Sequence, residues 1–181
     1  PDLGNSILML TVFFAILLLT NIPIITLLFL GFSGVSVILI SIFTHPYQLQ
    51  RIQSFLNPWG DTLGKNYHII QSFTAIGSGG VFGFGIGESR LKYFYLPLHY
   101  SDFIFSVLCE EGGGILGITV ILLFAILCIR GIWLALRIKD NYKSLLLVGL
   151  ILVICVQAFI NIGVVIGVLP ITGIPLTFIS F

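Results

Sequence analysis

The sequence predicts an all-α polytopic membrane protein. Hydrophobic residues make up 57% of the 181-residue chain and charged residues only 8%, whereas soluble domains carry about 25% charged residues. A water-soluble fold would therefore have too few polar side chains for its surface. Apolar stretches of the ~20 residues that a spanning helix needs recur on both sides of one long polar insert. Residues 1–181 are expected to form a single membrane domain. Because the chain opens at Pro1 without a Met, it is expected to be a fragment of a longer polytopic protein.

Two spans are predicted before the insert. No charged residue lies between Leu3 and Gln50. Within this run Pro23 marks the break, because a proline and the residue before it disfavour helix continuation. The spans are accordingly placed at residues 6–19 and 24–43.

Two spans are predicted after the insert, at residues 102–133 and 144–168, followed by the first part of a fifth that stops at Phe181. The loop 134–143 between them belongs to a fourteen-residue stretch with four basic residues, Arg130, Arg137, Lys139 and Lys143. Lys and Arg accumulate in the cytoplasmic loops of membrane proteins. The short loop is therefore predicted to be cytoplasmic, and the insert, residues 45–101, to face the outer side.

The insert is predicted to contain short helices at the membrane surface. Residues 47–56 place apolar side chains at intervals among glutamines and Arg51, which is typical of an amphipathic helix lying in the interface. A turn follows, with Trp59 suited to the headgroup level, and residues 67–76 are predicted to form a second short helix. The stretch 77–87 contains too many glycines for a stable helix interior.

Asp102 is the leading candidate for chemistry, because it stands where the insert enters the third span. One interpretation is structural, with Ser101 or Asp102 capping the helix N-terminus. The other is that Asp102 is a general base, since a carboxylate at the edge of the hydrocarbon is partly desolvated and a charge at membrane depth is functional by default.

Glu110 and Glu111 lie two turns further into the same span. An unpaired carboxylate in lipid is costly, so one of them is expected to face a polar cavity or a basic partner. The structural alternative is an ion pair with Arg51 or Arg90. The chemical alternative is a supporting role at the site.

Six glycines between Gly77 and Gly87 fit neither the dinucleotide fingerprint nor a P-loop. They are expected either to allow close backbone packing or to form a backbone cradle for a diphosphate. Gly79 and Gly80 are assigned a supporting role.

Polar and basic residues of the insert are candidates for binding an anionic headgroup, the alternative being a general attraction to anionic lipids. The assigned substrate-binding residues are Arg51, Lys65, Arg90, Lys92, Ser89 and Gln71. The three histidines (His45, His68, His99) lack metal-ligand spacing and are expected at the interface, so no metal site is assigned. The three cysteines (Cys109, Cys128, Cys155) lie in apolar runs, as buried thiols do. No basic arm for nucleic acid is present.

Short motifs follow one another in a fixed order along the chain. They are Pro1-Asp2-Leu3-Gly4, Arg51 with Phe55-Leu56-Asn57-Pro58, Asp61-Thr62-Leu63-Gly64, Gln71-Ser72, Ala75-Ile76-Gly77-Ser78-Gly79-Gly80, Leu96-Pro97, Ser101-Asp102-Phe103-Ile104, Glu110-Glu111, Asn161-Ile162-Gly163 and Thr172-Gly173-Ile174-Pro175. In this order they resemble the SEDS proteins, the FtsW/RodA/SpoVE family of cell-wall polymerases, over essentially the whole chain. The division-type FtsW branch is the most similar.

The resemblance implies a ten-helix membrane protein, of which this chain would be part of the C-terminal half. It implies polymerisation of lipid II into glycan strands, with a class B penicillin-binding protein (a transpeptidase) and other division proteins as partners. The family's essential acid is the aspartate of its Thr/Ser-Asp-Phe-Ile motif, which is Asp102 here. The leaving diphosphate is expected to need compensation from basic residues or from a divalent cation, Mg²⁺ or Mn²⁺.

The chain also departs from the family pattern. Leu98 and Tyr100 stand where the family often has Glu and His. Such variants resemble cyanobacterial members, so the chain is expected in a bacterial plasma membrane or a plastid inner envelope membrane. Gly112 and Gly114 replace apolar residues and are expected to loosen the helix. Two alternatives stay open: a lipid II flippase, since intramembrane acids and broken helices suit transporters, and a non-catalytic division scaffold.

Overall fold

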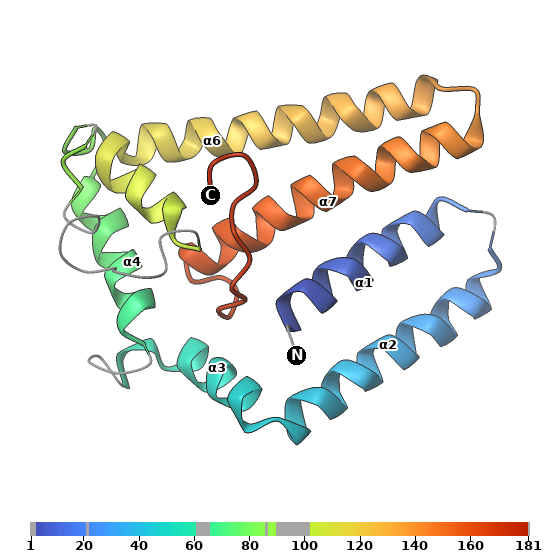
Figure 1. Ribbon diagram of the computed structural model, residues 1–181, viewed down its shortest axis with the longest axis horizontal. Helices are drawn as coiled ribbons and strands as arrows, with labels where there is room; N and C mark the ends of the chain where they lie inside the picture. Colours follow the sequence, from blue (N-terminus) through green and yellow to red (C-terminus); the bar gives the residue numbers. More distant parts are fainter. Residues whose placement is uncertain (1–2, 21, 61–65, 86, 90–101, 181) are drawn as a thin grey trace.

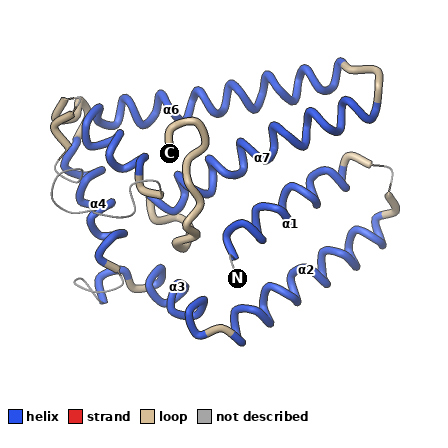
Figure 2. The backbone as a smooth tube through the Cα atoms, viewed as in Figure 1, coloured by secondary structure: helices blue, strands red, loops and turns tan. Residues whose placement is uncertain are grey.

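The structure, a computed structural model, describes residues 3–20, 22–60, 66–85, 87–89 and 102–180. Within these ranges it consists of helices and their connections, with no strand (Figure 2). The helices are α1 (Leu3–Leu18), α2 (Ile24–Thr44), α3 (Pro46–Leu56), α4 (Tyr67–Gly79), α6 (Ile104–Arg137) and α7 (Asn141–Val165). Figure 1 shows two helical hairpins, α1–α2 and α6–α7, with α3 and α4 along one end, here called the insert end.

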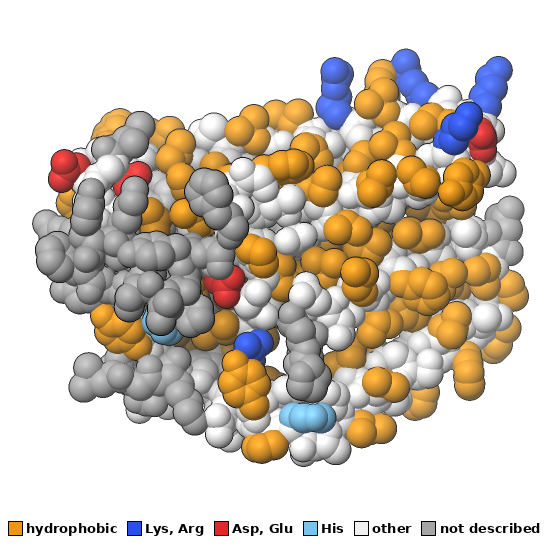
Figure 3. Space-filling model, in the orientation of Figure 1, with side chains coloured by type: hydrophobic (Ala, Val, Ile, Leu, Met, Phe, Trp, Pro, Cys, Tyr) orange, Lys and Arg blue, Asp and Glu red, His pale blue; other side chains and the backbone are white. Residues whose placement is uncertain are grey.

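Among the described helices, α2, α6 and α7 are long and apolar enough to cross a membrane, and α1 is a shorter apolar helix. They occupy the stretches where the sequence predicts spans. Hydrophobic side chains cover much of the face formed by these helices (Figure 3), as lipid contact requires. The chain is therefore an all-α polytopic membrane protein.

The connection between α6 and α7 is shorter than the predicted loop 134–143, since only residues 138–140 lie outside the helices. Asp140 begins α7 as its N-cap, because its side chain accepts a 3.0 Å hydrogen bond from the Tyr142 N–H. The Ser144 hydroxyl donates to the Ala135 carbonyl at 2.8 Å and ties the two helices together. These contacts extend both helices beyond their predicted ends.

The segment after α7 does not continue as the predicted fifth span. Residues 166–180 form turns and extended chain that fold back over the bundle. Ile174 and Leu176 bury their side chains almost completely there, at 1% and 0% exposed. This return places the segment beside the start of α6.

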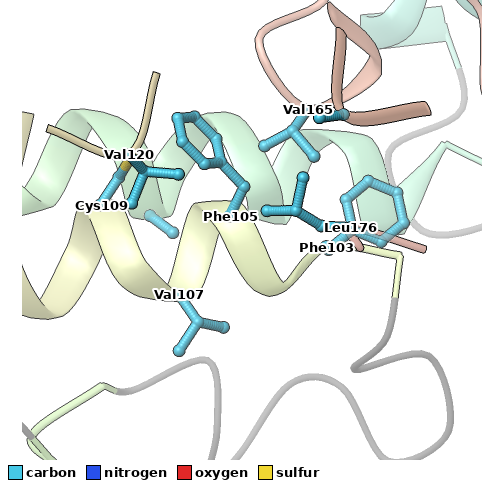
Figure 4. Packing of buried hydrophobic residues seen from close by; sticks show 9 residues of the cluster. Phe103, Phe105, Val107, Cys109, Val120, Val165 and Leu176 are labelled. Atoms are coloured by element: carbon cyan, nitrogen blue, oxygen red, sulfur yellow. The ribbon is translucent and has the colours of Figure 1, made fainter. Parts of the chain in front are cut away.

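The core lies where α4, α6, α7 and the returning segment meet. Figure 4 shows the ring of Phe105 of α6 between Val120 and Val165, with Leu176 nearby, all members of one buried cluster. A second cluster joins α1 to α7 through Leu8 and Val164. In contrast, α2 buries none of its residues within the described structure. The packed core therefore supports the insert end of α6.

The insert folds as the sequence predicts in its helices. Pro46 occupies the first turn of α3, where its missing N–H costs nothing. The Asn66 amide donates to the carbonyls of Asn57 (3.1 Å) and Pro58 (2.9 Å), which holds the start of α4 beside the end of α3. α4 ends at Gly79, three residues later than predicted. These two helices form one wall of the cavity described next.

Candidate functional site

A cavity of about 360 Å³ lies at the insert end, between α3, α4, the start of α6 and the segment after α7. Its lining residues are Tyr47, Gln50, Arg51, Ser54, His68, Asp102, Phe103, Ile171 and Gly173. Arg51 and Asp102, which the sequence assigns to binding and catalysis, therefore share one cavity. The fold brings them together from positions far apart in the chain.

Asp102 stands just before α6 and is held through its main chain. Its carbonyl accepts a 2.8 Å hydrogen bond from the Asn161 amide, and the same amide donates to the Ile174 carbonyl at 2.7 Å. Gly173 has φ 73°, and a Cβ there would lie 3.6 Å from the Asp102 Oδ2. The N-cap position of α6 falls on Phe103, not on Asp102. The capping interpretation of Asp102 stays an alternative, because helix ends are assigned only to within one or two residues.

Arg51 has a positioning role in the same cavity. Its Nη1 donates to the carbonyls of Ile171 (3.1 Å) and Thr172 (3.4 Å). Its Nη2 donates to the Tyr47 hydroxyl at 2.8 Å, and the guanidinium carbon lies 4.7 Å from the centre of that ring. Among the described residues, Arg51 forms no ion pair with Glu110 or Glu111. Arg51 thus fixes the segment beside Asp102 and brings positive charge to the cavity.

His68 is a cavity residue that sequence reasoning missed. It lies in the first turn of α4, and its ring stacks on Phe103 with centroids 6.5 Å apart. The sequence places it at the interface only because it lacks metal-ligand spacing. Asn161 was not assigned to the site either, although a buried amide is expected to have a hydrogen-bond partner.

A break in α6 organises the region next to the cavity. Gly113 has φ 68° and ψ −173°, which interrupts the helix. In an unbroken helix the N–H groups of Gly114 and Ile115 would donate to Glu110 and Glu111. They donate instead to the carbonyls of Gly80 (2.9 Å) and Val81 (3.4 Å). The break thus lies at Gly113, between the two glycines that are expected to loosen the helix.

The glycine-rich stretch also donates hydrogen bonds to the two α6 carbonyls that the break leaves without helical partners. The Glu110 carbonyl accepts from the Phe84 N–H at 3.1 Å, and the Glu111 carbonyl from the Gly85 N–H at 2.9 Å. A Cβ at Gly79 would collide with the Cys109 carbonyl oxygen. These N–H groups are engaged within the protein, which favours the packing interpretation of the glycines over the diphosphate cradle.

The remaining assigned residues lie outside the cavity or outside the described structure. The Ser89 hydroxyl donates to Glu110 Oε2 at 2.5 Å, and both side chains are buried, at 0% and 3% exposed. Ser89 therefore supports the broken helix. The cavity-lining residues do not include Gln71, Glu111, Gly79 or Gly80. Lys65, Arg90 and Lys92 lie outside the described residues.

Comparison with known proteins identifies the family. A family model described as cell cycle protein, FtsW/RodA/SpoVE, matches residues 1–181. The chain belongs to this family. Its whole length is 46% identical to stage V sporulation protein E of Bacillus subtilis (strain 168), covering 50% of that protein. It is 41% identical to the putative peptidoglycan glycosyltransferase FtsW of Cyanophora paradoxa, covering 46% of it.

A solved structure shares the fold of this FtsW/RodA/SpoVE chain. It comes from work on the structural coordination of polymerization and crosslinking by a peptidoglycan synthase complex. The match has a TM-score of 0.72 and 28% identity, and covers 99% of this chain and 50% of that one. The chain spans about half the length of the curated relatives it matches. The family resemblance of the motifs is confirmed.

Proposed function

We propose that the protein is a membrane peptidoglycan glycosyltransferase that polymerises lipid II, with Asp102 as the general base. The observation that carries the proposal is the single cavity at the insert end that both Asp102 and Arg51 line. The family and the name of the Cyanophora relative support it. A base beside a fixed cation suits a reaction that removes a proton and releases an anion.

In the proposed reaction, Asp102 takes the proton from the 4-hydroxyl of the acceptor sugar. That oxygen attacks the anomeric carbon of the donor, and the bond from this carbon to the diphosphate breaks. The leaving undecaprenyl diphosphate takes the electron pair, and Arg51 contributes positive charge from the cavity wall. Lys65, Arg90 and Lys92 remain candidates for binding the same group.

A divalent cation, Mg²⁺ or Mn²⁺, remains part of the proposal. Among the described residues, no group of three or more His, Cys, Asp or Glu side chains could hold a metal ion. Mg²⁺ is usually bound through one or two carboxylates and substrate phosphates. The cavity therefore fits such an ion through Asp102 together with substrate oxygens, where it would compensate the charge of the diphosphate.

The proposal includes a crosslinking partner. The solved relative comes from a peptidoglycan synthase complex that coordinates polymerization and crosslinking. A class B penicillin-binding protein is the proposed partner, together with other division proteins. The proposed location is the bacterial plasma membrane, or the inner envelope membrane of a plastid.

The broken helix bears on the flippase alternative. In transporters, carbonyls freed at such breaks coordinate the coupling ion. Here the carbonyls of Glu110 and Glu111 accept hydrogen bonds from Phe84 and Gly85. The break is thus filled by the protein's own loop, which favours the glycosyltransferase over the flippase.

The test uses the full-length protein with its transpeptidase partner and labelled lipid II. Asp102→Asn is expected to lower polymer formation by about 10²–10⁴-fold, because it removes the base. The matched control is Asp140→Asn, the same chemical change beyond the far end of α6. Asparagine caps helices about as well as aspartate, so this control should polymerise normally.

Each outcome separates the candidates. Equal polymer from the wild type and Asp102→Asn would remove Asp102 from the chemistry and point to Glu110 or Glu111. No polymer from a folded wild type with a competent partner would favour the flippase or the scaffold.

A further inference from the structure

The loop after α4 exposes two apolar side chains, Val81 and Phe82, here called the apolar tip. Val81 is 62% exposed and Phe82 is 82% exposed. Figure 1 shows this loop beside the bend near the start of α6. Contact of such side chains with water is unfavourable, so the depth of the tip in the membrane decides what it contacts.

Hydrogen bonds fix the apolar tip to α6. The carbonyls of Gly80 and Val81 accept from the two N–H groups that follow the break, and the Gly83 N–H donates to the Gly79 carbonyl at 2.7 Å. The next two N–H groups of the loop are bound to α6 carbonyls, as described above. Irregular backbone stays out of hydrocarbon unless its polar groups are paired within the protein. This loop can therefore approach the hydrocarbon boundary, with only its side chains entering lipid.

The length of α6 gives the depth of the tip. The Arg137 guanidinium lies 3.5 Å from the centre of the Trp133 ring, and tryptophan is enriched at membrane interfaces. Trp133 follows Gly113 by 20 positions, a helix length of about 30 Å. The hydrocarbon core of a bilayer is also about 30 Å thick. With Trp133 at one boundary, Gly113 lies at the other, and so does the tip bound beside it.

The charges of α6 indicate the same boundaries. No charged residue lies from Gly112 to Ile129, and this run forms about 27 Å of helix. Glu111 precedes the run and Arg130 follows it. Charged side chains are rare within the hydrocarbon layer. The layer therefore begins close to the break, where the tip is attached.

The apolar tip adjoins the lipid-facing side of α6. Ile115 and Ile118 follow the break, and their side chains are 51% and 60% exposed. The Ile115 N–H donates to the Val81 carbonyl at 3.4 Å. The tip is thus continuous with apolar side chains that already require lipid as their neighbour.

We propose that the apolar tip inserts into the leaflet on the insert side, at the boundary between the acyl chains and the headgroups. Phenylalanine is among the side chains with which interfacial segments enter this layer. Insertion would fix the depth of α4, which supplies His68 to the wall of the Asp102 cavity. The inference does not depend on the proposed glycosyltransferase activity.

The experiment measures the depth of a nitroxide spin label on the full-length protein in vesicles of phosphatidylethanolamine and phosphatidylglycerol. Phe82→Cys is labelled after the other accessible cysteines have been replaced. Molecular oxygen concentrates in hydrocarbon, whereas a charge-neutral nickel chelate stays mainly in water. Oxygen should therefore relax the label on Phe82→Cys more strongly than the chelate does.

Two further labelled variants calibrate the depth. Glu88→Cys is the matched control in the same loop, because Glu88 is exposed and its charge favours water. Ile118→Cys lies about one turn inside the span. The ratio of oxygen to chelate relaxation should rise from Glu88→Cys through Phe82→Cys to Ile118→Cys.

Two results would overturn the inference. A chelate effect at Phe82→Cys as strong as that at Glu88→Cys would place the tip in water. Weak relaxation by both reagents would show that protein covers the tip, either the rest of the chain or a partner. If Phe82→Cys does not fold, the neighbouring Val81→Cys carries the same test with the same expected order.

Discussion

At the scale of single residues, Asn161 is the side chain that fixes the candidate base. Its amide joins the carbonyls of Asp102 and Ile174, so one group connects the start of α6 to the segment after α7. The side chain is only 2% exposed. Without this donor, both carbonyls would lose a hydrogen bond that water could not easily replace.

Asn161→Ala is therefore expected to move Asp102 away from its working position. A misplacement of about 1 Å can cost about 100-fold in rate, so a loss of this order is expected in lipid II polymerisation. Initial rates and thermal unfolding should be measured together.

Gln157→Ala is the matched control. Gln157 lies one turn earlier on α7, and its amide donates to the Pro175 carbonyl at 3.1 Å in an exposed position. Exposed hydrogen bonds contribute little, so this variant should keep most of its activity. Equal losses in the two variants would show that Asn161 has no special role at the base.

Asp102 and Arg51 could be predicted from the sequence because a charged residue in a largely apolar chain is expected to have a function. Sequence reasoning missed His68 and Gly173, whose roles depend on which neighbours the fold supplies. Gly173 follows Asp102 by 71 positions, and no local pattern predicts that distance. Ser89, predicted to bind substrate, is buried and donates a hydrogen bond to Glu110, a contact that the sequence does not reveal.

At the scale of elements, the break in α6 is held by the glycine-rich stretch. The conformation of Gly113 is one that only glycine adopts readily, and a Cβ there would collide with the Val81 carbonyl oxygen. The break therefore depends on a residue without a side chain.

Gly113→Ala is expected to destabilise the protein by about 1–3 kcal/mol from the backbone conformation alone. The collision with Val81 adds to this loss. Thermal unfolding in detergent would measure it, with folded yield as a second readout.

The neighbouring Gly114→Ala provides the comparison. A Cβ at Gly114 would come no closer than 3.6 Å to the Gly80 carbonyl oxygen, an ordinary contact. Alanine also favours the helix over glycine by about 0.5–1 kcal/mol. A Gly113→Ala protein as stable as Gly114→Ala would contradict the described break.

Hydropathy predicts the long helices because each carries apolar side chains along its whole length, which either pack inside the protein or face lipid. It could not place the break at Gly113, since the hydrogen bonds that allow it come from residues 80–85. The apolar run after Pro175 is predicted to begin a fifth span, whereas residues 176–180 form turns. These turns, and the burial of Ile174 and Leu176, show that apolar side chains of this segment pack on the bundle.

At the scale of the whole molecule, the two hairpins give the bundle two different ends. The end of α1, the start of α2 and the connection 138–140 lie at one end, and α3 and α4 lie at the other (Figure 1). Basic residues surround the connection 138–140. That this end is cytoplasmic and the insert lies outside stays a prediction from these basic residues.

Cysteine labelling in intact cells tests this orientation. The reagent is a thiol label that cannot cross the membrane. Trp59→Cys is expected to react with it in intact cells, and Lys139→Cys only after the cells are permeabilised. Both side chains are exposed. A Cys128→Ser background is suitable because Cys109 and Cys155 are buried. The reverse pattern would invert the orientation and place the Asp102 cavity in the cytoplasm.

The contacts around Asp102 also set an order of assembly during synthesis. Asn161 leaves the ribosome 59 residues after Asp102, and Gly173 follows later still. The start of α6 therefore enters the membrane before the amide that holds the Asp102 main chain exists. A nascent chain that ends within α7 would carry the insert and the acid without a finished site. The proposed base would thus be held in place only after the segment 166–180 has folded back.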